Sequence, residues 1–428
     1  MSESKTFVQS LLGRFARVEP RETTAVVAAF FLFFFVLGSY FAVRPVRETI
    51  ATILGRDAVA DLWLYTAVFS IAIVPIYGWL VANIRRSILL PVIYGLVAAI
   101  MVWIGALLGA NEIHEGTGAF FYVWISVLNL MLVSIFWSFL LEMFSSEQTK
   151  RLFGFIAAGG TLGALVGPLT TRLAAESVGS GGILYIGAAG FVGAIVCQRI
   201  LLGIWKPVEA AQASSSGAKD RGIGGNPFSG ISIVLKSPYL LGIALFIVLL
   251  SAANTVLYFE QLRIVEETFA DRNQRTEVFA TIDLIVQSLT IVSQLFLTGR
   301  IATTFGVRAL LTFVPIALIL GFTVLAISPV FAVLAVVFVL RRWGEYAFIR
   351  PGREMLFSKL DTETKYKAKN FIDVPVYRAA DYVGAQAKVA IDALTASPTA
   401  SVVAGAVLAA GWAVVGWSLG RKHDANKS

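Results

Sequence analysis

Two adjacent arginines and a glutamate lie inside a long apolar stretch in the second half of the chain. Arg341 is twelve residues beyond Pro329, so in a helix that enters a membrane near Pro329 it lies about 18 Å deep. Arg341 and Glu345 are four residues apart and can pair on one helical face. An ionisable group in a membrane span costs at least about 2.5–3.5 kcal/mol, so it usually faces a cavity or a partner. The pair leaves Arg342 for a solute anion; the alternative is an ion pair that only locks helices together.

A second polar pattern lies between residues 371 and 394. Polar side chains recur there at spacings of four, four, three, four and four residues, which places on one helical face Asp373, Tyr377, Asp381, Gly384, Lys388 and Asp392. Arg378 precedes Asp381 by three residues. The stretch 276–297 repeats the pattern more mildly with Asp283, Gln287, Thr290 and Gln294. We expect both faces to line the path of a solute; the alternative is a water-filled lining without specific contacts.

The first apolar stretch, residues 23–54, also contains charges. Tyr40 precedes Arg44, Arg47 and Glu48, and the sequence is mostly apolar again from residue 50 to 54. If the helix stopped near residue 43, the charges would lie at an outer rim. We expect instead one tilted helix whose outer half presents them to a pore.

An excess of arginine at these positions favours an anionic ligand, because guanidinium is always charged and binds phosphate or carboxylate with two hydrogen bonds. Aromatic side chains nearby can stack on a base. The predicted solute-binding residues are Arg44, Arg47, Arg341, Arg342, Glu345, Asp373, Tyr377, Arg378 and Asp381. Further expected lining residues are Tyr40, Glu48, Trp137, Glu142, Glu260, Arg263, Asp283, Gln287 and Tyr346. We expect the empty site to hold the arginines of 341–342 on Asp373 and Asp381.

The sequence contains no phosphate-binding Walker motif, no metal-ligand cluster and no Ser-His-Asp set. We therefore expect no catalytic residues, no bound metal and no cofactor, and a protein that is not an enzyme. The absence of a Walker motif argues against ATP hydrolysis as an energy source.

Composition explains where these side chains lie. Hydrophobic residues make up 57% of the 428 residues and charged residues only 14%, against roughly 25% in soluble domains. Apolar runs of about 20 residues recur without the alternation of barrel strands, which indicates membrane-spanning helices. The net charge of +8 lies mostly in short loops between the runs, which argues against nucleic acid as a partner.

Twelve spans are predicted. In the first half they are 23–54, 61–84, 87–108, 119–144, 152–172 and 181–204; in the second half they are 238–258, 276–297, 309–327, 329–348, 371–394 and 399–419. Lys and Arg gather in alternate loops, for example Arg85 with Arg86, Lys150 with Arg151, Arg300 with Arg308, and the cluster 350–369. The positive-inside rule then places both termini in the cytoplasm. We expect a multi-pass protein of a bacterial-type inner membrane that functions as a monomer.

The predicted domain organisation has two halves. A cytoplasmic segment (1–22) precedes a six-helix half (23–205), a flexible Gly/Ser/Ala-rich linker (206–236), a second six-helix half (237–420) and a cytoplasmic tail (421–428). The halves resemble each other: Tyr40-Phe41 recurs 218 residues later, Glu142-Met143 recurs 212 later, and Phe155-Ile156 recurs 216 later. Such a parallel duplication is typical of the major facilitator fold, in which a solute binds between pseudo-symmetric halves.

One glycine pattern predicts packing rather than chemistry. Gly159, Gly163 and Gly167 repeat every fourth residue, which lets two helices approach closely.

Several segments resemble the ATP:ADP antiporters of plastids and intracellular bacteria. They are FWSFLLEMFSSEQTKRLFGFIAAGG at 136–160, the basic stretch from Lys365 to Asp373, and Arg44-Pro-Val-Arg47-Glu48. The resemblance covers most of the chain and implies an all-α major facilitator fold and nucleotide antiport. Two positions depart from it. Ala379-Ala380-Asp381 stands near the place of a Gly-Lys-Ser, and Arg47 stands in place of a lysine.

Three classes of function therefore remain open. The first is nucleotide exchange across a lipid bilayer. The second is transport of another anionic metabolite or organic phosphate, in a form that can be coupled to protons through Asp373, Asp381 or Glu345. The third is a membrane module without transport.

Overall fold

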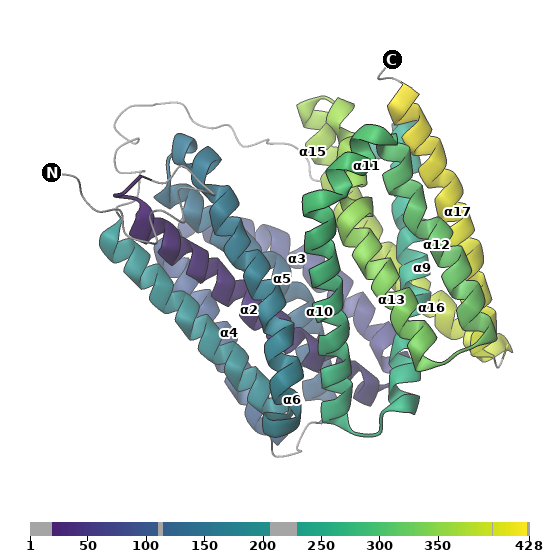
Figure 1. Ribbon diagram of the computed structural model, residues 1–428, viewed down its shortest axis with the longest axis horizontal. Helices are drawn as coiled ribbons and strands as arrows, with labels where there is room; N and C mark the ends of the chain where they lie inside the picture. Colours follow the sequence, from purple (N-terminus) through teal and green to yellow (C-terminus); the bar gives the residue numbers. More distant parts are fainter. Residues whose placement is uncertain (1–18, 110–113, 206–228, 396, 426–428) are drawn as a thin grey trace. The chain divides into compact units, whose positions relative to one another are not determined.

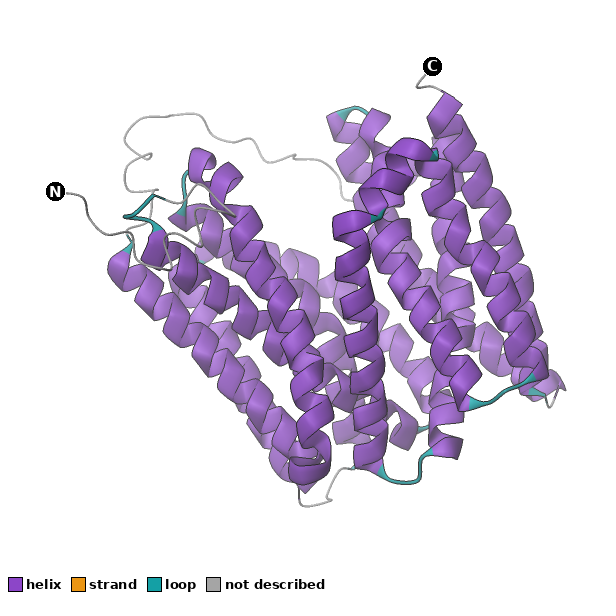
Figure 2. Cartoon of the chain, viewed as in Figure 1, coloured by secondary structure: helices purple, strands orange, loops and turns teal. Residues whose placement is uncertain are grey.

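The computed structural model describes residues 19–109, 114–205, 229–395 and 397–425, which are nearly all helical and contain no strand (Figures 1 and 2). The first part consists of α2 (Thr23–Leu54), α3 (Arg56–Asn83), α4 (Arg86–Gly109), α5 (Glu115–Met143) and α6 (Ser146–Ile204). The second consists of α8 (Ser229–Lys236), α9 (Pro238–Thr268), α10 (Arg272–Phe296), α11 (Thr298–Thr304), α12 (Gly306–Ile327), α13 (Phe331–Gly344), α14 (Arg350–Leu356), α15 (Thr362–Phe371), α16 (Tyr377–Thr395) and α17 (Pro398–Ala425).

Nine helices within the described residues are long and apolar enough to cross a membrane, which confirms a multi-pass α-helical membrane protein. The bounds of the first predicted span, 23–54, are confirmed to the residue. Helix α2 runs unbroken from Thr23 to Leu54, so the charges of this span lie on a continuous helix.

The fifth and sixth predicted spans lie in one helical segment, α6. The expected break between them is a kink at Gly179, whose φ of 67° is left-handed. The expected loop before it reads Leu-Ala-Ala-Glu and continues the helix, because these residues have high helix propensity. Only the glycine adopts the conformation that turns the chain.

The tenth and eleventh predicted spans are helices interrupted by π turns. Glu345–Ile349 form the first turn and Ile372–Val376 the second. Each turn is close to a proline, Pro351 or Pro375, which lacks the N–H that an α-helix needs and clashes with a carbonyl four residues earlier. Single π turns are frequent at functional sites, and both of these contain predicted site residues.

Several helix ends differ from the predicted span ends because polar residues continue the helix beyond its apolar stretch. Helix α9 runs ten residues past the predicted end, to Thr268, and α17 continues to Ala425 inside the predicted tail. The predicted loop 350–369 is mostly helical, as α14 and α15, and α8 occupies the end of the predicted linker. The remainder of the linker, 206–228, lies outside the described residues.

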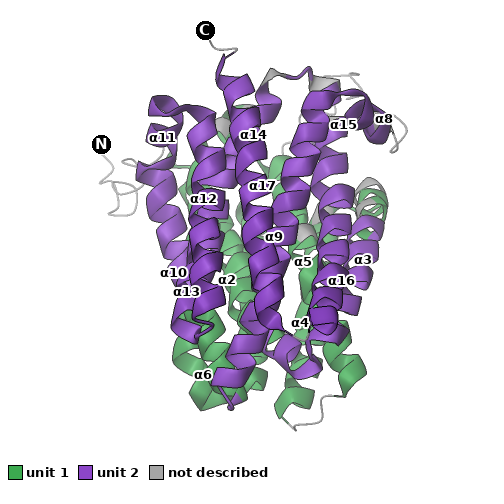
Figure 3. Ribbon diagram, turned by 90° about the vertical axis from the view of Figure 1, so that its right-hand side faces the viewer, with its two compact units in different colours: residues 1–47, 73–220, 272–281 green, residues 48–72, 221–271, 282–428 purple. Residues whose placement is uncertain are grey.

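The chain forms two compact units (Figure 3). Unit 1 contains residues 1–47, 73–220 and 272–281, and unit 2 contains 48–72, 221–271 and 282–428. The units therefore do not coincide with the predicted halves, because the segment 48–72 belongs to unit 2 and the start of α10 to unit 1.

Within unit 1, the predicted glycine pattern brings α6 against α2. The α-carbon of Gly163 is 3.6 Å from the point where a Cβ on Gly38 would lie, and a Cβ on Gly163 itself would meet the backbone of Phe34 and Gly38. Thr171 continues the contact by donating to the Ala42 carbonyl at 2.6 Å. The packing interpretation of this stripe is confirmed.

Within unit 2, α9, α12 and α17 form the apolar core. The indole of Trp412 is fully buried and meets Phe246 edge-on, with ring centroids 5.8 Å apart. A Cβ on Gly416 would lie 2.8 Å from the Leu311 carbonyl oxygen, so α17 lies directly on the α12 backbone. This core supports α13 and α16, which pack against its helices.

Candidate solute-binding site

A cluster of charged side chains forms where α13 meets its π turn; we call Asp283, Arg341, Arg342, Glu345 and Arg350 the arginine cluster. The carboxylate of Glu345 is 7% exposed and accepts from Arg350 at 3.1 and 3.3 Å. Arg341 pairs with the same carboxylate at 3.5 Å, which confirms the predicted pairing of residues four apart. One buried glutamate is therefore shared by two guanidinium groups.

Arg342 is paired with Asp283 of α10. Both are buried, with 3% of each residue exposed. The sequence predicted that Arg342 would be left for a solute or for an acid, Asp373 or Asp381. The acid that it pairs with is Asp283 instead, and binding of a solute stays a prediction. A buried guanidinium needs a counter-charge, and the face of α10 that carries Asp283 supplies it.

Asp373 and Asp381 have other partners. The Asp381 carboxylate accepts from Ser251 of α9 at 2.5 Å and pairs with Arg378 at 3.5 Å. Asp373 lies 3.4 Å from Arg353. Asp381 still belongs to the electrostatic neighbourhood of the arginine cluster, because the charges of Glu345 and Arg341 act on it.

The C-terminal part of the polar face of α16 forms a separate group, the Lys388 network. The Lys388 ammonium, 1% exposed, binds Glu260 at 2.9 Å and also Asp392. Glu260 is fully buried and accepts from Arg263 at 2.7 Å. Arg56 lies 4.0 Å from Asp392.

Two residues of the polar face of α16, Asp381 and Lys388, thus make specific contacts with α9. The α9 face extends to the segment 48–72, since Tyr258 donates to Glu48 at 2.9 Å and its ring packs at a tilt against Trp63, with centroids 5.3 Å apart. The predicted residues Glu260 and Arg263 therefore lie with Lys388, and Glu48 contacts Tyr258 on the same helix as Glu260.

The predicted residues of unit 1 lie on α2 and α5. Arg47 donates to Ser126 at 3.1 Å, and its guanidinium carbon is 5.3 Å from the Tyr122 ring centroid. Tyr40 is buried, and Arg44 and Glu142 are half-buried. Trp137 packs within 5.3 Å of Phe33, Phe136 and Phe153, so aromatic neighbours already surround the ring that the sequence offered for stacking on a base.

Two predicted residues of unit 2, Gln287 and Tyr377, are half-buried on α10 and α16. Tyr346 lies under Arg350, with the guanidinium carbon 4.4 Å from its ring centroid.

Sequence reasoning missed two members of the site. Arg350 was assigned to a loop, and Asn254, which donates to Glu345 at 3.4 Å, was not noticed on apolar α9. Prolines near both spans were the available signal for a π turn. No pattern in the sequence marks Asn254.

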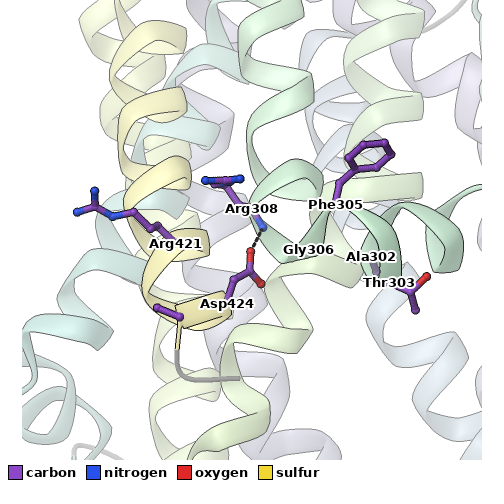
Figure 4. Close-up of a pocket in the computed structure, with 8 residues that line it drawn as sticks. Ala302, Thr303, Phe305, Gly306, Arg308, Arg421 and Asp424 are labelled. Carbon is purple, nitrogen blue, oxygen red and sulfur yellow. Dashed lines mark hydrogen bonds between the residues drawn. The ribbon is translucent and has the colours of Figure 1, made fainter. Parts of the chain in front are cut away.

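A second polar feature lies at the ends of α11, α12 and α17, around a cavity of about 440 Å³ (Figure 4). Asp424 accepts from the backbone N–H groups of Val307 and Arg308 at 3.0 and 3.1 Å and so caps α12. Gly306, with φ of 79°, leaves room for this carboxylate. Among the described residues, no three His, Cys, Asp or Glu side chains are grouped to hold a metal ion.

Solved structures share this architecture. The nucleoside transporter NupG is 14% identical with a TM-score of 0.63, over 94% of this chain and 98% of that chain. A bacterial homologue of the human lysosomal transporter Spinster, inward-facing and unoccupied, is 13% identical with a TM-score of 0.60, over 94% and 98%. The POT family transporter PepTSo is 13% identical with a TM-score of 0.61, over 95% and 99%.

The chain therefore has the major facilitator fold. No protein-family profile matches the sequence. No curated protein matches it either.

Proposed function

We propose that the protein is a secondary transporter that moves an organic anion by alternating access, with nucleotide exchange as the first candidate. The observation that carries the proposal is the charge of the arginine cluster. Three arginines face two carboxylates there, which leaves one net positive charge at a site where Asp283, Arg342 and Glu345 are buried. Buried charges of this kind in membrane proteins mark substrate pathways.

Three further points favour a nucleotide. Guanidinium forks suit phosphate oxygens. The sequence resembles nucleotide exchangers in three segments, and one solved structure of similar fold is a nucleoside transporter. A nucleotide combines a nucleoside with a phosphate anion, so Arg341 and Arg342 would bind its phosphates.

Counterflow in proteoliposomes tests the proposal. Vesicles loaded with unlabelled ADP should accumulate labelled ATP, and Arg341→Lys, which keeps the charge but loses the fork, should slow uptake by roughly tenfold or more. Arg300→Lys is a matched control, because it exchanges the same residue types outside the cluster. Absence of exchange with nucleotides and with other organic phosphates would refute transport of this class.

Asp381 favours a second candidate, proton-coupled transport of another organic anion. Its carboxylate lies on α16 beside Arg378 and a neutral hydroxyl, that of Ser251. Uptake that depends on a pH gradient and is lost in Asp381→Asn would favour this candidate. Uptake that depends only on internal nucleotide would favour exchange.

The orientation remains part of the proposal. The loops rich in Lys and Arg place both termini in the cytoplasm. A reporter fused after Gly116 should then read as external, and a cytoplasmic reading would reverse the topology.

A further inference from the structure

Arg342 has hydrogen-bond donors without an acceptor in the described part of the chain. Its Nη1 is bound to Asp283 and its guanidinium interacts with Tyr346, while its Nε and Nη2 have no acceptor within hydrogen-bond distance among the described residues. The neighbouring Arg341 likewise has an Nε without an acceptor. The three unused donors lie on two consecutive residues, and Arg342 is only 3% exposed.

Unused donors of this kind require a partner. A buried N–H group without an acceptor carries its full desolvation penalty, and nearly all such groups in proteins are satisfied by protein or water. The Nε–Nη2 edge of a guanidinium is a side that can bind two oxygens of one phosphate or carboxylate. The Nε and Nη2 donors of Arg342 can therefore bind an oxyanion while Nη1 remains bound to Asp283.

Asp283 has a defined electrostatic effect on such a ligand. Without an anion, its carboxylate supplies the counter-charge that buried Arg342 needs. When an anion arrives, the same carboxylate repels it and competes for the guanidinium. Its presence therefore lowers the affinity of the occupied site and speeds release.

We propose that Arg341 and Arg342 bind an oxyanion group with several terminal oxygens, as in a phosphate ester or anhydride, and that Asp283 is an internal competing carboxylate at this site. The inference deepens the proposed function and rests on it for the direction of transport, but binding can be measured without transport.

The alternative is that the Arg342–Asp283 pair is purely structural, and this alternative predicts a different effect of replacing Asp283 on anion binding. If the pair only held α10 to α13, replacing Asp283 would leave anion binding unchanged or weaken it through loss of structure. If Asp283 competes, its replacement by the isosteric asparagine tightens binding. The sign of the change in Kd separates the two roles.

The experiment measures equilibrium binding of labelled inorganic pyrophosphate, and separately of ADP, to the purified full-length protein in detergent. Asp283→Asn should lower Kd by about tenfold, because the competitor reduces the fraction of sites able to bind. Asp283→Glu keeps the competing charge and should stay near the wild-type Kd. Arg342→Lys should raise Kd by about tenfold or more.

Glu22→Gln is the matched control. It removes one negative charge from a buried carboxylate, paired with Arg151 outside the arginine cluster, and should leave Kd within about twofold. Asp283→Asn should also lower both KM and kcat of counterflow, since tighter binding slows release. If Asp283→Asn requires an anion to stay folded, purification in pyrophosphate followed by dialysis still gives its Kd.

Each possible result of the binding experiment either supports or overturns the inference. Tighter binding in Asp283→Asn supports the inference, even if no counterflow occurs and the transport proposal fails. Counterflow with an unchanged or raised Kd in Asp283→Asn overturns the inference and leaves transport standing. No binding of either probe to the wild type or to Asp283→Asn also overturns it.

Discussion

Arg350 donates to the carboxylate of Glu345, five residues earlier in the chain, with its Nη2 3.1 Å from Oε1. In a regular α-helix, residues five apart point in different directions, whereas residues three or four apart share a face. The π turn at Glu345–Ile349 widens the helix there and brings Arg350 onto the carboxylate. The turn thus adds a second cation to a glutamate that already has Arg341.

Replacing Arg350 by glutamine should weaken the site through charge. The variant removes the net positive charge of the arginine cluster, so the KM for an anionic solute should rise roughly three- to tenfold and depend less on salt. The moderate size follows from the exposure of the Arg350 side chain, 56%. Arg353→Gln, which removes a guanidinium that pairs with Asp373, is the control and should change KM little. Equal KM values in both variants would exclude Arg350 from the site.

The sequence predicted local pairs well and distant pairs poorly. The pair of Arg341 with Glu345 follows from helical spacing alone. The residues of two other pairs, Arg342 with Asp283 and Asp381 with Ser251, lie 59 and 130 residues apart in sequence, on different helices. Nothing in a single sequence specifies which polar faces meet. The predicted pairing of the arginines with Asp373 and Asp381 was wrong because packing decides which residues of two helices lie opposite each other.

The buried Lys388 network gives a prediction about stability. Lys388→Met leaves Asp392 without its nearest cation and Glu260 with Arg263 alone, which should destabilise the protein by about 3–5 kcal/mol. Thermal unfolding in detergent measures the loss.

Adding Asp392→Asn to Lys388→Met removes the carboxylate that has lost its nearest cation and should recover part of that stability. A wild-type unfolding temperature for Lys388→Met would show that the pair contributes nothing.

Glycine positions on α6 offer a paired test of helix packing. Gly163→Ala forces a methyl group against the α2 backbone, 2.8 Å from the Gly38 nitrogen, and should cost roughly 1–3 kcal/mol. Gly154→Ala, on the same helix with nothing within 4 Å, should be neutral or stabilise by roughly 0.5–1 kcal/mol. If both variants unfold at the same temperature, the close approach of α2 and α6 is not as described.

Span positions followed from apolar run length, but helix ends did not. Apolar residues determine where a helix is buried in lipid, and polar residues can extend it into water without altering that signal. Helix α9 continues through Glu260, Arg263 and Glu267 because Arg263 pairs with both glutamates along the helix. The kink at Gly179 was not predicted because a loop was expected between the two spans, whereas a single glycine turns the chain there.

The last prediction concerns pH and the start of α2. Burial raises the pKa of Glu22, but hydrogen bonds from Arg151, from the Glu19 N–H and from Gln148, at 2.8–3.0 Å, outweigh it and hold the pKa below its ordinary value. A carboxyl whose pKa is lowered on folding stabilises the protein above its unfolded pKa of about 4.3, and this stabilisation is lost as pH falls through the folded pKa. Wild-type protein should therefore unfold at a higher temperature than Glu22→Gln at pH 7, and the difference should shrink as pH falls below about 4.3. Glu147→Gln, an exposed carboxyl nearby, should show no such difference. A gap between wild type and Glu22→Gln that persists unchanged to the lowest pH measured would mean that the Glu22 carboxylate does not hold α2 to α6 by charge.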